Sequence, residues 1–182
     1  ERWAAAAWPH RDPQSINIES GLVDAAGSLL FAEFDKAGIG AGVAMGLDWG
    51  IELGEPPVPL RDVHRHYSEM QGRFPGRFFG AAGIDPRRPD AVELLEEAIV
   101  RLGLKALKMY PPCGFFPFEP VCRPLYDKCL DLDVPVVFHT AVVGFPHVAR
   151  FANPLNVGDV QALYPSLTIV FALTILVAPR AF

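Results

Sequence analysis

Residues 104–140 read LKALKMYPPCGFFPFEPVCRPLYDKCLDLDVPVVFHT, and this stretch decides the fold. Its two ends, 104–110 and 135–140, are short apolar runs of the kind that form buried β-strands. The segment 119–132 between them is predicted to be a helix, because its apolar residues recur three and four positions apart. Those residues are Cys122, Leu125, Tyr126, Cys129 and Leu132. A strand, a helix and a second strand in this order predict two parallel strands joined by a crossover helix.

The same alternation continues on both sides of this unit. Successive predicted strands lie roughly 26 to 37 residues apart, which is the size of a βα unit. Five such strands fit an open doubly wound sheet or part of a (β/α)₈ barrel, which typically needs ~250 residues, and the periodicity does not choose between them. The further predicted segments are strands at 42–47, 78–84 and 167–172 and helices at 21–37, 60–74 and 90–102.

The composition restricts the class of protein. Of the 182 residues, 51% are hydrophobic and 20% are charged, and the formal net charge is −5. A chain this apolar is not disordered, and an acidic balance without a run of Lys and Arg argues against a nucleic-acid partner. The longest apolar run, 167–178, is shorter than the ~18–20 residues that a membrane-spanning helix needs. We therefore expect neither a nucleic acid nor a membrane as a partner.

Three cysteines, Cys113, Cys122 and Cys129, are odd in number and form no C-x-x-C pair. We interpret them as free, buried thiols and expect a reducing, cytoplasmic location. No signal-peptide pattern opens the chain. Residues 1–20, which are rich in Trp, Pro and Ala, are expected to be an irregular lead-in to a single domain that covers residues 1–182.

Two stretches look like functional motifs but lie in the wrong local structure. GIGAG at 38–42 follows a predicted helix and enters a predicted strand, which is the reverse of the order that a dinucleotide-binding loop requires. DVHRH at 62–66 has the form of a metal-binding pair, whose two histidines share a face only on a strand. Because 60–74 is predicted to be a helix, His64 and His66 point about 200° apart. We interpret both as solvated histidines without a metal-binding role.

His139 and Lys108 are the strongest candidates for site residues. His139 closes a buried strand, and the carboxyl ends of parallel strands are where α/β proteins place their ligands. It is either a metal ligand or general base, or else a hydrogen-bonded core histidine. Lys108 either faces the mouth of the site or extends outward between helices, and its position alone favours the outward orientation slightly. We assign Lys108 and the neighbouring Tyr110 to a substrate pocket, and no catalytic residue is assigned.

Several segments together resemble the amidohydrolase-related family of metal-dependent (β/α)₈ enzymes, which includes hydrolases and decarboxylases of the aminocarboxymuconate-semialdehyde and resorcylate types. The resemblance covers about residues 30–172 and depends on the order and spacing of the segments. They are FDKAGI at 34–39, FPGRF at 74–78, GIDP at 83–86, LKALKMYP at 104–111, LY at 125–126, VPVVFHT at 134–140, ANPL at 152–155 and YPSLTIVFA at 164–172.

The resemblance implies a partial (β/α)₈ TIM barrel that contains about strands 2 to 6 with their helices. It also implies a divalent metal, with zinc expected, and places a ligand at His139. The first-strand H-x-H pair of the family has no counterpart here, and its eighth-strand aspartate would lie beyond Phe182. The family histidine after the sixth strand corresponds to Leu173, which neither binds metal nor transfers protons. The metal site is therefore expected to be incomplete in this chain.

The resemblance implies a metal-dependent amidohydrolase-like enzyme that hydrolyses, or decarboxylates without oxidation, a small organic acid or ring substrate. The chain is expected to be a fragment, inactive as given. The alternative is a catalytically incomplete α/β domain with a binding or subunit-association role, for which a homo-oligomer is a compatible partner. A third, weaker interpretation is an open five-stranded sheet that binds a small ligand beyond its strand ends.

Overall fold

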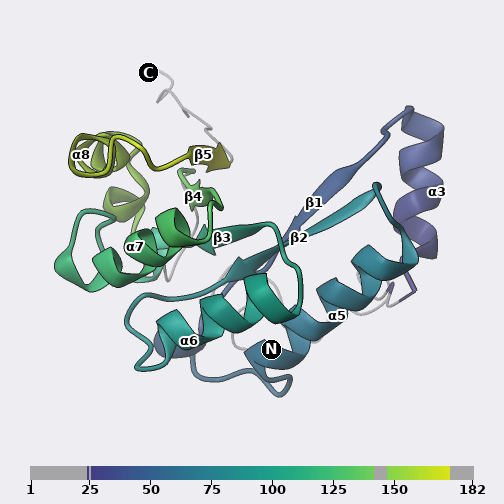
Figure 1. Cartoon of the computed structure of the whole chain (residues 1–182), viewed down its shortest axis with the longest axis horizontal. Coiled ribbons are helices and arrows are strands. Elements are labelled where there is room, and N and C mark those ends of the chain that lie inside the picture. Colours follow the sequence, from purple (N-terminus) through teal and green to yellow (C-terminus); the bar gives the residue numbers. More distant parts are fainter. Residues whose placement is uncertain (1–23, 25, 142–146, 173–182) are drawn as a thin grey trace, which may run out of the picture.

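The computed structural model describes residue 24, residues 26–141 and residues 147–172. The predicted lead-in at 1–20, Leu173 and the first residues of the helix predicted at 21–37 lie outside the described residues. Within them, the five expected strands are present and alternate with helices along the chain (Figure 1). The strands are β1 (Gly42–Met45), β2 (Phe78–Gly83), β3 (Ala106–Met109), β4 (Val136–His139) and β5 (Ile169–Ala172).

The helices follow the predicted segments, with two additions. The main helices are α3 (Ser28–Ala37), α5 (Leu60–Arg73), α6 (Ala91–Glu96) and α7 (Arg123–Asp131). The segment predicted at 90–102 leaves the α-helical form at Glu97–Arg101, where it continues as a π-helical turn. Two short helices were not predicted, α4 (Gly50–Leu53) and α8 (Leu155–Leu163). Single 3₁₀ turns occur at Pro111–Cys113, Pro120–Cys122 and Ala149–Ala152.

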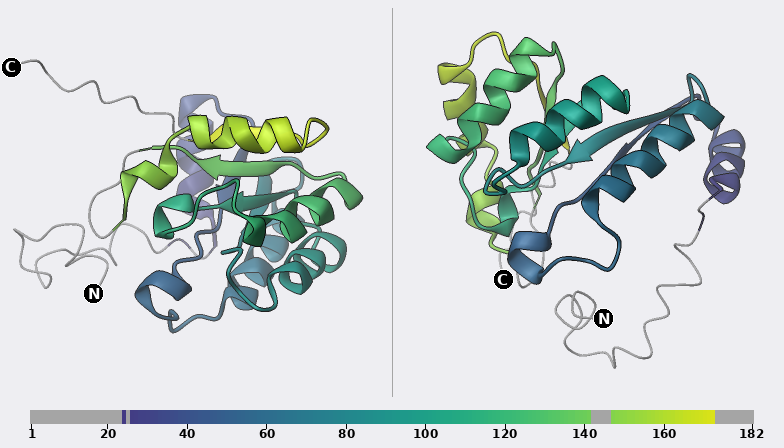
Figure 2. Two further views of the ribbon diagram at one scale, coloured as in Figure 1. Left: turned by 90° about the vertical axis from the view of Figure 1, so that its left-hand side faces the viewer. Right: turned by 60° about the horizontal axis from the view of Figure 1, so that its bottom comes forward.

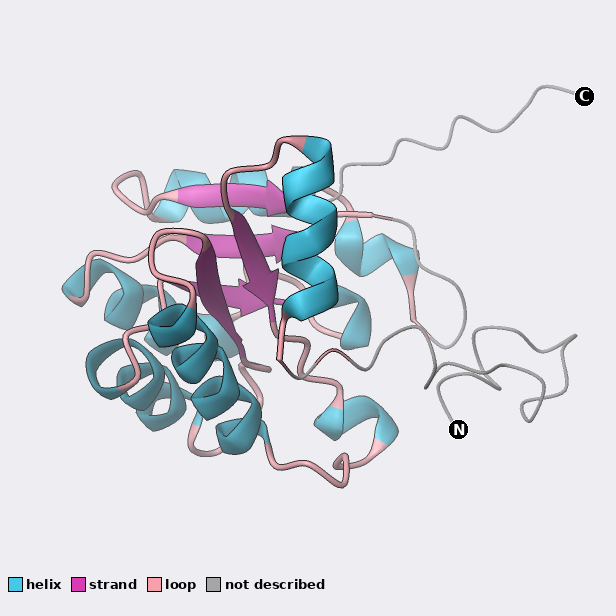
Figure 3. Ribbon diagram, turned by 90° about the vertical axis from the view of Figure 1, so that its right-hand side faces the viewer, coloured by secondary structure: helices cyan, strands magenta, loops and turns pink. Residues whose placement is uncertain are grey.

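The order of the strands decides between the two architectures that the sequence left open. The sheet runs β1-β2-β3-β4-β5, and each neighbouring pair is parallel. A doubly wound sheet reverses its strand order at a switch point, whereas a barrel adds each strand beside the previous one. The strands also follow a curve instead of lying in one plane (Figure 3). The sheet therefore has the topology of part of a (β/α)₈ barrel.

The main core lies between the sheet and the helices on its outer side (Figures 1 and 2). Outward-facing strand residues such as Leu107, Met109 and Phe138 are completely buried there. The three cysteines are buried free thiols, as predicted. On the inner face, Val43, Met45 and Val170 are exposed, while a small hydrophobic group is buried. That buried inner-face group is Ala81, Ala106, Val137 and Ala172.

Among the described residues, we find no helix whose length and apolar character would suit a membrane span.

His64 corrects the sequence interpretation. It lies on α5, as predicted, but its side chain is only 1% exposed and is not solvated. One face of the helix packs against β2, and it carries Leu60, His64, Tyr67 and Gln71. The Gln71 side-chain carbonyl accepts a hydrogen bond from the Gly80 backbone N–H at 2.8 Å. Four-residue and three-residue spacings place His64 on that same face. The prediction of a solvated His64 came from the apolar stripe of this helix, from which both histidines were expected to turn away.

Burial gives His64 an unusual protonation equilibrium. Desolvation lowers the pKa of His64 from 6.5 to about 4, and the Gly83 backbone and the charge of Asp48 offset that effect only in part. The native state therefore keeps His64 neutral at pH values where the unfolded chain already binds a proton. The other buried histidine, His139, shows a pKa lowered to about the same value.

We predict that the free energy of unfolding falls as the pH is lowered from about 6.5 to about 4, the interval between the unfolded and folded pKa values of His64. A difference of this size corresponds to roughly 3 kcal/mol for one site. Urea unfolding across this pH range should show a clearly smaller loss of unfolding free energy for His64→Gln than for the wild type. The loss that remains in the variant is due to His139. His66→Gln, on the same helix but only half buried, is the matched control and should behave as the wild type. Equal pH dependence in both variants would contradict the assignment.

Candidate functional site

The polar residues of interest meet at the carboxyl edge of the sheet. Asp48 lies three residues after β1, Asp85 two residues after β2, Tyr110 directly after β3, and His139 is the last residue of β4. All five strands are parallel, so their carboxyl ends lie at one edge. Residues far apart in the sequence are thereby brought together at the position where α/β barrels build their sites.

The two aspartates at this edge are already paired. The Asp48 carboxylate is almost completely buried and accepts hydrogen bonds from Arg88 Nε at 2.5 Å and Nη2 at 2.7 Å. It also accepts hydrogen bonds from the backbone N–H groups of Gly50 and Asp85. The bond from Asp85 connects the loop after β1 to the loop after β2. Asp85 accepts two further hydrogen bonds from the Arg87 side chain, at 2.9 and 2.6 Å. These carboxylates stabilise the loops and have little capacity left for a ligand.

Lys108 lies on the inner face of the sheet. In the sheet register it is level with Gly83 of β2 and Val137 of β4. It is 3% exposed, and its Nζ has no hydrogen-bond partner among the described residues. The prediction of an outward amine that extends between helices was therefore wrong, because the strand alternation directs Leu107 and Met109 to the helices and Lys108 to the opposite side. Burial lowers the pKa of Lys108 from 10.5 to about 8.

His139 points to the same inner face as Lys108. It is 6% exposed, and its Nε2 atom finds no hydrogen-bond partner in the described part of the chain. Desolvation lowers the pKa of His139 to about 4, and the charges of Lys108 and His147 act in the same direction. The backbone of Ala141 opposes this shift. The imidazole is therefore neutral near pH 7, which is the form that coordinates a metal.

Tyr110 packs against three other rings. Its ring centroid lies 4.5 Å from that of His139, 5.2 Å from His147 and 5.7 Å from Trp49. Trp49 and His147 are also in contact, at 5.4 Å. Burial raises the pKa of the Tyr110 hydroxyl, which therefore remains protonated. The structure thus brings together Lys108, Tyr110 and His139. It adds Trp49 and His147, which no pattern in the sequence singles out.

The described residues supply part of a metal site. The buried, unpartnered Nε2 of His139 fits the role of one ligand. A catalytic zinc takes about three protein ligands, and no group of three or more His, Cys, Asp or Glu residues suited to a metal occurs among the described residues. His64 and His66 do not contribute a pair, since His64 packs against β2 and the two side chains diverge. His139 is consistent with a metal ligand, but the ligand set in the described residues is incomplete.

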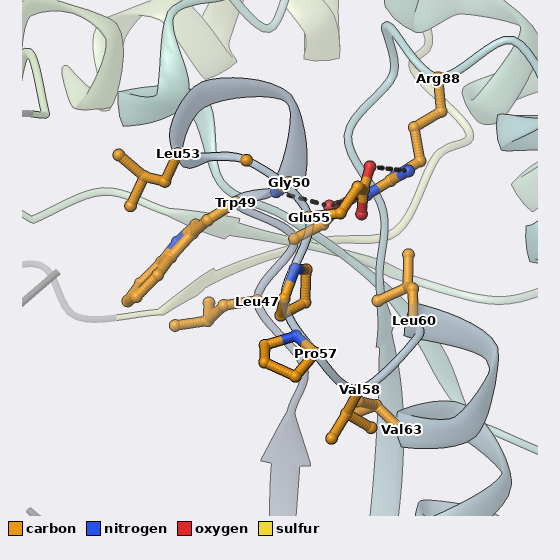
Figure 4. Close-up of a pocket in the computed structure, with 13 residues that line it drawn as sticks. Leu47, Trp49, Gly50, Leu53, Glu55, Pro57, Val58, Leu60, Val63 and Arg88 are labelled. Atoms are coloured by element: carbon orange, nitrogen blue, oxygen red, sulfur yellow. Dashed lines mark hydrogen bonds and ion pairs between the residues drawn. The ribbon is translucent and has the colours of Figure 1, made fainter. Parts of the chain in front are cut away.

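A separate cavity of about 660 Å³ lies beside this edge (Figure 4). Its walls come from the loop after β1, from α4 and from the start of α5, with Leu60 and Val63 on one side. Most of the wall is apolar, and its charged groups are paired, because Arg88 bonds to both Asp48 and Glu55. Lys108, Tyr110 and His139 are not among its lining residues. Trp49 lines the cavity and also contacts Tyr110, so the cavity adjoins the site predicted at the inner face.

Comparison with known proteins identifies the family and the fold. A sequence profile described as "Amidohydrolase" matches residues 30–172. None of the curated proteins matches the chain significantly. Among solved structures, the 5-carboxyvanillate decarboxylase of Sphingomonas paucimobilis has a TM-score of 0.69 at 17% identity, with 88% of this chain and 55% of that chain covered.

Two further solved structures support the same fold. The 5-carboxyvanillate decarboxylase of Novosphingobium aromaticivorans, solved with manganese and a nitrobenzoic acid, has a TM-score of 0.64 at 18% identity, with 89% of this chain and 53% of that chain covered. A TIM-barrel protein of uncharacterised function from Bordetella bronchiseptica has a TM-score of 0.64 at 25% identity, with 91% and 60% covered. The chain thus spans between half and two thirds of these structures. The predicted fold class, a partial (β/α)₈ barrel, is confirmed.

We predict that Asp48→Asn lowers the free energy of unfolding by about 3 kcal/mol, because it leaves a mostly buried guanidinium without its main partner. Glu55→Gln is the matched control, since it removes the other carboxylate bound to Arg88. The Glu55 side chain is 60% exposed, so its loss should cost less than about 1 kcal/mol. Urea denaturation of the two variants gives the comparison. Equal losses would show that the buried Asp48–Arg88 pair has no special role.

We predict that Lys108→Met stabilises the protein, because it removes an amine that is buried without a described partner. The lowered pKa implies a cost of about 3 kcal/mol for holding the ammonium in the folded state at pH 7. The wild type should also gain stability as the pH rises from about 8 to about 10.5, the interval between the folded and unfolded pKa values. Lys105→Met, at the exposed lysine before β3, is the control and should change neither property. Thermal unfolding against pH tests both statements, and a destabilised Lys108→Met variant would contradict them.

Proposed function

The chain belongs to the amidohydrolase family, and we propose that it is part of a metal-dependent enzyme that hydrolyses or decarboxylates a small organic acid or ring substrate. The observation that carries the proposal is the Nε2 atom of His139. It is buried at the carboxyl edge of the sheet without a described hydrogen-bond partner, beside Lys108 and Tyr110. A buried polar atom of this kind costs free energy unless a ligand satisfies it.

In this proposal, His139 holds a divalent metal together with ligands from outside the described residues. The metal would activate water for hydrolysis, or hold a carboxylate-bearing substrate for decarboxylation. Zinc was the sequence expectation. The related decarboxylase structure contains manganese, so nothing favours zinc specifically. The charge of Lys108 and the burial of His139 both keep the imidazole unprotonated, which favours coordination over a wide pH range.

Lys108 and Tyr110 have the roles of substrate-binding residues in this proposal. The Lys108 ammonium is held on the inner face with no described partner, and it can donate hydrogen bonds to a substrate carboxylate. The Tyr110 ring, buried beside His139, offers a flat apolar wall to a ring substrate. Neither residue is assigned a proton-transfer step. Because His139 alone does not complete a metal site, we propose that residues 1–182, one incomplete barrel domain, are inactive by themselves.

A second candidate function is an association role without catalysis. The observation in its favour is the exposed inner face of the sheet, where Val43 and Met45 of β1 and Val170 of β5 are accessible to solvent. Exposed apolar side chains on the two outermost strands are positions where another part of the protein or a second copy would pack. Sedimentation analysis that finds a stable dimer, together with no bound metal, would favour this candidate over the enzyme.

For a longer version of the protein that supplies the remaining ligands, the enzyme proposal predicts binding of manganese or zinc, and His139→Ala should reduce the bound metal at least tenfold. The physical reason is the loss of a ligand from a site that needs about three. The measurement is metal content after loading with each ion and removal of the excess. His66→Ala is the control and should retain wild-type metal content, because its side chain lies on α5 away from the edge. Unchanged metal content in His139→Ala would exclude this residue as a ligand.

A further inference from the structure

Polar groups at the carboxyl edge are unevenly satisfied. The carboxylates of Asp48 and Asp85 are paired with Arg88 and Arg87. The nitrogen atoms on the other half of the edge have no such partners. Lys108 Nζ, His139 Nε2 and both ring nitrogens of His147 are buried without a hydrogen-bond partner among the described residues. The edge therefore holds several buried nitrogen groups without a described partner, while the carboxylates of Asp48 and Asp85 are already paired.

His147 is fixed at this edge by ring contacts. Its ring lies 5.2 Å from Tyr110 at an interplanar angle of 75° and 5.4 Å from Trp49 at 49°. Trp49 in turn contacts Tyr110 at 5.7 Å. Three loops that follow three different strands thus contribute one ring each to a closed cluster. These contacts hold the imidazole through its faces and edges, and both of its nitrogen atoms are buried without a described hydrogen-bond partner.

The surroundings of His147 place it close to the candidate metal ligand. The charges of His147 and Lys108 both act on His139, which puts the three side chains in one electrostatic neighbourhood. Glu52 of α4 also acts on His147, but burial has the larger effect and lowers the pKa of the ring. Glu52 is exposed at the rim.

We propose that His147 is a further substrate-binding residue, whose ring N–H donates a hydrogen bond to the carboxylate of a planar organic acid while the Lys108 ammonium donates a second. This inference rests on the proposed function, because it concerns the substrate of the same site. A carboxylate is the ligand that fits, because it accepts several hydrogen bonds and its negative charge pairs with the Lys108 ammonium, which has no described partner. The rings of Trp49 and Tyr110 suit a planar substrate body.

A role for His147 as a second metal ligand is less favoured. His139 and His147 are two ligands, and the described residues offer no group of three. The ring contacts with Trp49 and Tyr110 also constrain the imidazole at the wall of the site, which suits contact with a substrate.

The test uses benzoate as the probe and benzamide as its neutral counterpart. Binding is measured by calorimetry with protein freed of metal by a chelator and, separately, with protein loaded with manganese. His147→Phe keeps a ring against Trp49 and Tyr110 but removes both nitrogens. His147→Gln restores a hydrogen-bond donor without the ring. His66→Phe is the control for a histidine change away from the edge.

We expect His147→Phe to weaken benzoate binding about tenfold or more, the usual loss for a hydrogen bond to a charged group. Benzamide binding should change less than about twofold, since it lacks the charge. His147→Gln should recover part of the benzoate affinity, and His66→Phe should match the wild type. The inference is overturned if wild-type protein does not bind benzoate, if His147→Phe binds it normally, or if both probes weaken equally.

The outcomes separate this inference from the proposed function. Metal uptake that depends on His139, with benzoate affinity independent of His147, would contradict the inference and leave the enzyme proposal intact. Benzoate binding that depends on His147, in a longer version of the protein that includes the remaining barrel strands and still takes up no metal, would contradict the enzyme proposal and support a carboxylate-binding site.

Discussion

The alternation of side chains along β3 and β4 is the constraint on which the rest of the structure depends. Leu107, Met109 and Phe138 point outward and are fully buried under the helices. The same alternation directs Lys108 and His139 inward, to the face opposite the helix-covered core. A register shift of one residue would place the lysine in the helix-covered core and expose the apolar set. Packing of the outer core thus fixes the positions of the site residues.

The carboxyl edge combines a rigid half and an unsatisfied half. On the first, the Asp48 carboxylate joins two loops through Arg88 and backbone N–H groups, so that the loop carrying Trp49 is held in place. On the second, Lys108 Nζ and His139 Nε2 are buried without described partners. Natural proteins tolerate such costs mainly at functional sites, where a ligand provides the missing interactions. This contrast distinguishes the inner-face site from the apolar cavity beside it.

Much of the fold was accessible to sequence reasoning. All five strands occur where apolar runs predicted them, and the helices at 60–74 and 119–132 follow the predicted spacing. Short helices such as α4 were missed because four residues are too few to establish a period. Candidate residues at strand ends, His139 and Tyr110, were also accessible, since parallel strands bring their carboxyl ends together. Loop residues carry no such signal, so Trp49 and His147 were found only in the structure.

The sequence by itself determined the parallel α/β class, the positions of the strands and the location of His139 at a strand end. Local periodicity contains that information, because it reflects which side chains must be buried. Only the tertiary structure decided that the strands follow one another in order around a curve, that Lys108 faces inward and that His64 is buried against β2. The strand order, the orientation of Lys108 and the burial of His64 each depend on which helix and strand faces pack against one another. A helix face or strand face acquires its environment from distant parts of the chain, and no local pattern specifies that partner.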